Sequence, residues 1–126
     1  MAEFAAGLAW VALGSALGGA ARFIVSELAL RWLGGPMPWG TLAVNVTGAF
    51  ALGALAAAGH GGTGALAAVW QLAAVGVLGS YTTVSSFSLQ TLSLWRAGAH
   101  GAAMANVALS LALGLAAAAA GLAVAS

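Results

Sequence analysis

The stretch GVLGSYTTVSSFS, residues Gly76 to Ser88, carries six serine or threonine side chains and two glycines within an apolar segment from about Ala65 to Trp95. The length and hydropathy of this segment predict a membrane-spanning helix, because crossing a bilayer requires about 20 mostly apolar residues. Glycine weakens a helix, and serine and threonine hydroxyls compete for its backbone hydrogen bonds. We therefore predict that this span leaves helical geometry around Gly79 to Thr83, near the bilayer midplane.

A backbone break inside a bilayer exposes N–H and C=O groups that protein, water or ions must satisfy. Carbonyl oxygens freed in this way coordinate cations in other membrane proteins. The alternative is a continuous helix in which each hydroxyl bonds back to a carbonyl of the preceding turn. The residues of this segment are compatible with both interpretations.

The composition predicts an integral membrane protein. Three arginines and two glutamates are the only charged side chains among 126 residues, of which 63% are hydrophobic. Soluble domains carry about a quarter of their residues as charges. A net charge of +1 without a basic cluster argues against a nucleic-acid partner, and the absence of cysteine excludes thiol chemistry. We expect a multi-pass protein in contact with lipid in a bacterial or archaeal cell membrane.

Glycine- and proline-rich turns divide the chain into four predicted helices within a single domain, residues 1–126. An all-α fold follows, with spans at about Phe4 to Trp32, Thr41 to Ala58, Ala65 to Trp95 and Ala102 to Val124. Small residues allow helices to approach closely in lipid, and Gly14 and Gly18 form one such pair. Four short helices enclose a pathway poorly, so we expect an oligomer. The difference in the number of arginines between the two sides of the membrane is small, so the chain could insert in both orientations.

Few polar side chains lie within the other spans. Asn45 lies in GTLAVNVTGAF, and Asn106 and Ser110 lie one turn apart in MANVALSLALG. Such residues usually face the bundle interior or a pathway, and interhelical hydrogen bonding is the alternative. In the third span, the positive ring edge of Phe87 can face an anion, although phenylalanine more often serves packing.

The second- and third-span motifs, GTLAVNVTGAF and GVLGSYTTVSSFS, resemble the paired signatures of the Fluc (CrcB) fluoride channels. GGAARF, residues 18–23, and ANVALSLALG, residues 105–114, resemble the family's first- and fourth-helix patterns. The resemblance covers nearly the whole chain, in order and without large gaps.

This resemblance implies an antiparallel dual-topology homodimer that exports fluoride passively through two pores. It also implies a structural Na+ at the dimer centre that is not transported, held by the backbone carbonyls of Gly79 and Thr82. The residues that match the family's fluoride pathway are Asn45, Phe87, Ser85, Ser86, Ser110, Thr83 and Arg22. Val84 stands where the family commonly has the first pore phenylalanine, so the aromatic edge is lost at that position.

Three other functions fit less well. A small proton-coupled drug exporter of dual topology normally needs a membrane-embedded carboxylate, but Glu3 and Glu27 lie near predicted helix ends. A scaffold protein would explain the glycines but not the polar third span. An enzyme is not expected, because His60 and His100 lie in predicted turns without a partner for a triad or a metal site.

Overall fold

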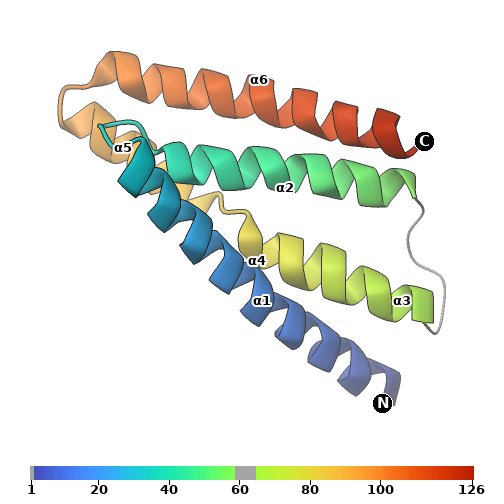
Figure 1. Ribbon diagram of the computed structural model, residues 1–126. Coiled ribbons are helices and arrows are strands. Elements are labelled where there is room, and N and C mark those ends of the chain that lie inside the picture. Colours follow the sequence, from blue (N-terminus) through green and yellow to red (C-terminus); the bar gives the residue numbers. More distant parts are fainter. Residues whose placement is uncertain (1, 59–64) are drawn as a thin grey trace.

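The computed structural model describes residues 2–58 and 65–126 (Figure 1). Their regular elements are all helical: α1 (Ala2–Trp32), α2 (Trp39–Ala57), α3 (Ala65–Trp70), η1 (Gln71–Leu78), α4 (Gly79–Tyr81), α5 (Ser85–Arg96) and α6 (His100–Ala125). The segment from α3 to α5 forms one interrupted span. The predicted all-helical class with four long apolar spans is therefore confirmed. The predicted second turn, Gly59 to Gly64 with His60, lies outside the described residues.

The third span is broken within the predicted range of Gly79 to Thr83. Gly79 keeps helical torsion angles of φ -62° and ψ -33°. The helix continues through Tyr81, and Thr82 is extended with φ -81° and ψ 157°. The break thus lies at the C-terminal end of the predicted range, because a glycine only weakens a helix. The chain departs from the helix where a neighbouring side chain replaces the lost backbone partners, as described below.

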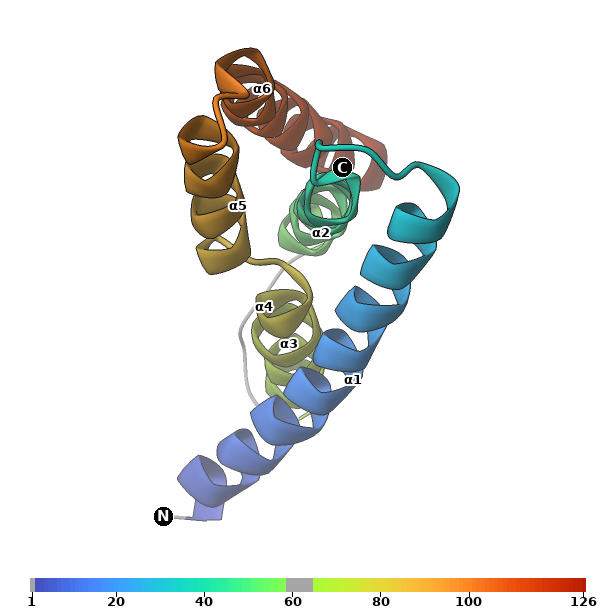
Figure 2. The ribbon, with the colours of Figure 1, turned by 90° about the vertical axis from the view of Figure 1, so that its left-hand side faces the viewer.

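Glycines set the packing between α1 and the third span, which Figure 2 shows crossing obliquely. A Cβ atom on Gly14 would collide with the carbonyl oxygen of Leu72, and one on Gly18 would collide with that of Val77. Gly76 faces Gly14, so a Cβ there would lie 2.8 Å from the Gly14 Cα. The close approach predicted for Gly14 and Gly18 is confirmed, and its partner is the π-helical η1.

A second close contact joins α2 to α6, which run side by side in Figure 1. A Cβ on Gly53 would collide with the Ala118 carbonyl oxygen, and one on Gly121 would collide with that of Phe50. Backbones that approach this closely gain dispersion contacts that larger side chains would prevent. The two glycine contacts fix α1 on the third span and α6 on α2.

The interior of one chain is small, whereas its apolar surface is large. The buried apolar side chains of the described part are Leu42, Val44, Ala74, Leu94 and Ala103. Most leucines and aromatic residues are exposed instead, and Trp32 and Val84 are among the most exposed. Such surface needs lipid or another protein to cover it. The chain is a multi-pass membrane protein.

Adjacent glycines in α1 provide a test of this packing. We expect Gly18→Ala to destabilise the fold by about 1–3 kcal/mol, the usual cost of overpacking, because the new methyl group would collide with the Val77 carbonyl. Thermal unfolding in detergent measures the difference. Gly19→Ala is the matched control, since nothing lies within 4 Å of a Cβ there. Equal melting temperatures for the two variants would contradict the packing described for α1.

Candidate functional site

The side chain of Asn45 in α2 binds the backbone of Thr83 in the break. Its Nδ2 donates to the Thr83 carbonyl over 2.8 Å, and the Thr83 N–H donates to its Oδ1 over 2.7 Å. An amide matches a peptide group because it offers one acceptor and two donors. The pair therefore satisfies both backbone groups of a residue that has left the helix. The second N–H of Asn45 has no acceptor within residues 2–58 and 65–126.

Thr83 organises the start of α5. Its Oγ1 accepts a hydrogen bond from the Ser86 N–H over 3.1 Å and lies 3.3 Å from the Ser85 Oγ. A threonine hydroxyl in this position satisfies one of the N–H groups that every helix start leaves free. Thr83 is only 8% exposed. The structure thus brings Asn45, Thr83, Ser85 and Ser86 together at one point between α2 and α5.

These bonds free two backbone carbonyls. In a continuous helix the Thr83 N–H would bind the Gly79 carbonyl and the Ser86 N–H would bind the Thr82 carbonyl. Here both donors are used elsewhere, by Asn45 and by Thr83 itself. No described residue donates a hydrogen bond to either carbonyl. Gly79 and Thr82 are the two residues whose carbonyls the sequence predicts as sodium ligands.

An open groove of about 320 Å³ lies beside these carbonyls. Its lining comes from α2 and from both sides of the break, and most of it is apolar. The lining residues used below are Asn45, Gly79, Thr82, Thr83 and Val84. The amide of Asn45 and the break therefore border the same space.

A second hydrogen-bonded chain holds α5 against α6. Asn106, which is 1% exposed, donates from Nδ2 to the Thr91 Oγ1 over 2.8 Å. Thr91 in turn donates to the Phe87 carbonyl over 2.7 Å. Thr91 therefore bonds to the preceding turn, as the continuous-helix alternative predicted for hydroxyls, and Thr82 does the same with the Leu78 carbonyl. The hydroxyls of the third span therefore have different partners, because the Thr83 hydroxyl instead accepts from the Ser86 N–H at the break.

Two polar atoms on one face of α6 are buried without a partner in the described chain, the Asn106 Oδ1 and the Ser110 Oγ. Asn106 and Ser110 are four residues apart, so they share this face. A buried polar atom left unpaired costs about 1–3 kcal/mol. Water, an ion or a second protein chain can remove that cost. Ser110 thus has the unmet hydrogen-bonding capacity that a pathway residue needs.

Comparison with known proteins identifies the family. Residues 9–122 match the family described as CrcB-like protein, Camphor Resistance (CrcB). The chain belongs to the CrcB family. It is 52% identical to a protein of Rhodopseudomonas palustris named fluoride-specific ion channel FluC 2, over 99% of this chain and 97% of the relative. A Bradyrhizobium diazoefficiens protein of the same name is 50% identical over 88% of this chain and 82% of the relative.

The remaining predicted residues of this CrcB chain lie apart from Asn45. Arg22 is half-buried in α1, one turn beyond Gly18 and so on the face turned to the third span. It forms no ion pair with any described residue. Phe87 is half-buried in the first turns of α5. Val84 is 77% exposed and points away from the interior of its own chain.

Sequence reasoning missed the link between Tyr81 and Thr47 in this CrcB chain. The Tyr81 hydroxyl lies 2.8 Å from the Thr47 Oγ1, which also donates to the Ala43 carbonyl over 2.7 Å. The aromatic ring also lies close to Gly48, where a Cβ would be 3.3 Å from its Cδ2. A lone tyrosine directly before the break and a threonine two residues after Asn45 were the available signals.

A double-mutant cycle tests the chain from Asn106 to Phe87. We expect Thr91→Val to destabilise the protein by about 1–3 kcal/mol, because it leaves the Asn106 Nδ2 buried without an acceptor. Asn106→Leu should then cost little in the Thr91→Val background, since both polar partners are gone. Unfolding in detergent of the two single variants and the double variant measures the coupling. Additive free energies would show that the two side chains do not act together.

Proposed function

We propose that this chain forms a fluoride-selective channel through which fluoride leaves the cell passively. The observation that carries the proposal is the Asn45 amide fixed at a backbone break, with a spare N–H and two serines beside it. Membership of the CrcB family supports it, as do relatives named fluoride-specific ion channels.

Fluoride holds its water strongly, so a selective pathway must replace the hydration shell with hydrogen-bond donors. Asn45 offers an N–H, and Ser85, Ser86 and Ser110 offer hydroxyl groups. Thr83 holds this group of donors in place through its backbone and side chain. All of these donors are neutral and the sequence contains no lysine, so the anion can be released as well as bound. Phe87 would add the positive edge of its ring, whereas Val84 cannot.

We further propose that the working channel is an antiparallel homodimer of dual topology. The apolar surface of one chain exceeds its interior, and the groove beside the break is open on one side. A second copy would cover this groove and bring its own break close to the first. The carbonyls of Gly79 and Thr82 would then hold one structural Na+ from both chains, because freed carbonyl oxygens suit such an ion. The positive charge of the ion would attract the carbonyl oxygens of both chains and so hold the two breaks close to each other.

We propose a channel rather than an enzyme or a proton-coupled exporter. Glu27 is exposed and lies near the end of α1, whereas coupling a proton normally requires a carboxylate within the membrane. His100 begins α6, and its ring lies 4.0 Å from that of Trp95. The described residues contain no group of three acidic, histidine or cysteine side chains that could hold a catalytic metal.

Replacing the pathway amide tests the channel. We expect Asn45→Asp to abolish fluoride efflux from proteoliposomes, because a carboxylate repels the anion and turns an acceptor towards the Thr83 carbonyl. A fluoride electrode measures the efflux, with chloride as the control anion. Gly19→Ala is a control variant that should retain the original rate, since its new methyl group meets no neighbour. Undiminished efflux through Asn45→Asp would remove Asn45 from the mechanism and overturn the proposal.

Exchange of sodium tests the dimer. We expect replacement of Na+ by N-methylglucamine, at constant ionic strength, to lower the melting temperature of the purified dimer and increase its dissociation on dilution. Size-exclusion chromatography and thermal unfolding in detergent report both effects. Because the ion is structural, uptake of radioactive Na+ should not accompany fluoride flux. Dimer stability that is indifferent to Na+ would contradict the proposed ion.

A further inference from the structure

Tyr81 ends α4 and bonds to α2 directly before the break. Its hydroxyl lies 2.8 Å from the Thr47 Oγ1, and that oxygen donates to the Ala43 carbonyl over 2.7 Å. A threonine hydroxyl has only one hydrogen, so the Tyr81 hydroxyl is the donor of the bond between the two side chains. A phenol hydroxyl in an apolar environment needs such a partner. The end of α4 is thus tied to α2 by a directed hydrogen bond.

Gly48 allows Tyr81 and Thr82 to lie directly against α2. A Cβ at Gly48 would be 3.3 Å from the Tyr81 Cδ2 and would collide with the Thr82 Cγ2. The Thr82 Oγ1 donates to the Leu78 carbonyl over 3.0 Å, which leaves its methyl group turned towards Gly48. Two consecutive residues are therefore seated on α2 before the chain reaches Thr83.

The peptide unit between Thr82 and Thr83 carries one of the predicted sodium ligands. The peptide bonds of the described residues are trans, so the Thr82 carbonyl points opposite to the Thr83 N–H. That N–H donates to the Asn45 Oδ1 over 2.7 Å. Asn45 therefore fixes the C-terminal end of this peptide unit and directs the Thr82 carbonyl away from its own amide. The N-terminal end of the unit is held by the contacts of Thr82 with Gly48 and by Tyr81.

The direction of the Thr82 carbonyl depends on these two ends alone. Its oxygen accepts no hydrogen bond from a described residue, so nothing bonded to the oxygen itself holds it. The Gly79 carbonyl differs, because Gly79 keeps helical torsion angles of φ -62° and ψ -33° at the start of α4. A cation is bound through the dipoles of the carbonyls that point at it. A small rotation of the Thr82 peptide unit would therefore weaken the bound ion.

We propose that Tyr81 is a positioning residue for the structural Na+. Its hydrogen bond to Thr47 holds the end of α4 on α2 and thereby fixes the direction in which the Thr82 carbonyl meets the ion. Neither side chain would contact the ion, because both act through the Thr82 backbone. The inference rests on the proposed dimer and its ion, and it adds the side chains that set the affinity of that site.

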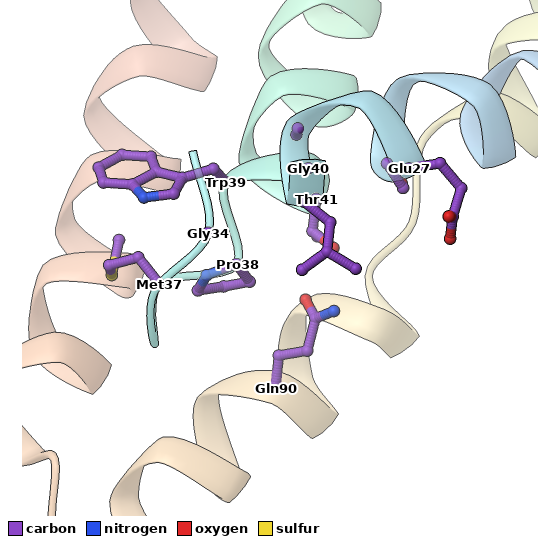
Figure 3. Close-up of a pocket in the computed structure, with 11 residues that line it drawn as sticks. Glu27, Gly34, Met37, Pro38, Trp39, Gly40, Thr41 and Gln90 are labelled. Atoms are coloured by element: carbon purple, nitrogen blue, oxygen red, sulfur yellow. The ribbon is translucent and has the colours of Figure 1, made fainter. Parts of the chain in front are cut away.

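The position of α2 does not depend on the bond between Tyr81 and Thr47. α2 packs against α6 through Gly53 and Gly121, where a Cβ would collide with a carbonyl of the other helix. Figure 3 shows Gln90 of α5 extending towards Thr41 of α2, and both residues line a cavity of about 220 Å³. Removal of the Tyr81 hydroxyl should therefore leave the helix packing intact and loosen only the end of α4.

Equilibrium binding of radioactive Na+ to the purified dimer tests the role of Tyr81. We expect Tyr81→Phe to raise the dissociation constant for Na+ about eightfold. Hydrogen bonds between membrane helices contribute on average about 0.6 kcal/mol each, and the two chains that share the ion would each lose one. The phenylalanine ring keeps the contact with Gly48. N-methylglucamine keeps the ionic strength constant at every Na+ concentration.

Substitutions of Thr47 and Thr91 separate positioning from a general loss of stability. Thr47→Val should raise the dissociation constant as much as Tyr81→Phe, with no further rise in the double variant. Thr47→Ser keeps a hydroxyl and should match the original protein. Thr91→Val removes a hydrogen bond between α5 and α6. It should lower the melting temperature with and without Na+ but leave the dissociation constant for Na+ unchanged.

The possible results distinguish the positioning role from the ion itself. A dimer of the original protein that binds no Na+ would overturn the proposed ion and with it the role of Tyr81. The same dissociation constant in the original protein and in Tyr81→Phe would keep the ion and reject only the positioning role. Equal rises in Tyr81→Phe and Thr91→Val would also reject it, because any lost hydrogen bond would then have this effect. If Tyr81→Phe forms no dimer, the comparison of Thr47→Val with Thr47→Ser decides in the same way.

Discussion

The reciprocal hydrogen bonds between the Asn45 amide and the Thr83 backbone are the constraint on which this structure depends. Inside a bilayer, a residue that leaves the helix has no water to satisfy its N–H and carbonyl. Asn45 replaces both partners with one side chain. The break is therefore stable. The Thr83 hydroxyl accepts from the Ser86 N–H at the start of α5. The carbonyls of Gly79 and Thr82 consequently have no donor among the described residues.

The glycine contacts hold this break in place from both sides. Gly14 and Gly18 allow α1 to approach η1 closely. Gly53 and Gly121 allow the same close approach between α2 and α6. The helix that carries Asn45 and the span that carries Thr83 are thus each anchored to another long helix. Few large side chains are buried, so the fold relies on close backbone approach rather than on a large apolar core.

Polar groups along the α2–α5 interface are arranged in steps of one helical turn. Asn45 and Ser86 lie at the break, and Thr41 and Gln90 lie one turn further towards the end of the span. Where α5 meets α6, Asn106 donates to Thr91, and Thr91 donates to the Phe87 carbonyl, in a separate hydrogen-bonded chain. Buried polar atoms without a partner in the described chain occur on both α5 and α6, at the Gln90 Oε1, the Asn106 Oδ1 and the Ser110 Oγ.

The sequence by itself determined the membrane class, the four helical spans, the glycine contact of α1 and the existence of a break, because these depend on local composition and spacing. It also singled out Asn45, Thr83, Ser85 and Ser86, although their roles in fluoride passage stay a prediction. Only the tertiary structure decided that the break within Gly79 to Thr83 lies at Thr82 and Thr83, that Asn45 binds Thr83, and that Thr82 and Thr91 bond within their own helix. A serine or threonine hydroxyl can bond to a carbonyl of the preceding turn or to a group on another helix. The packing of that other helix, which is distant in sequence, decides between the two partners.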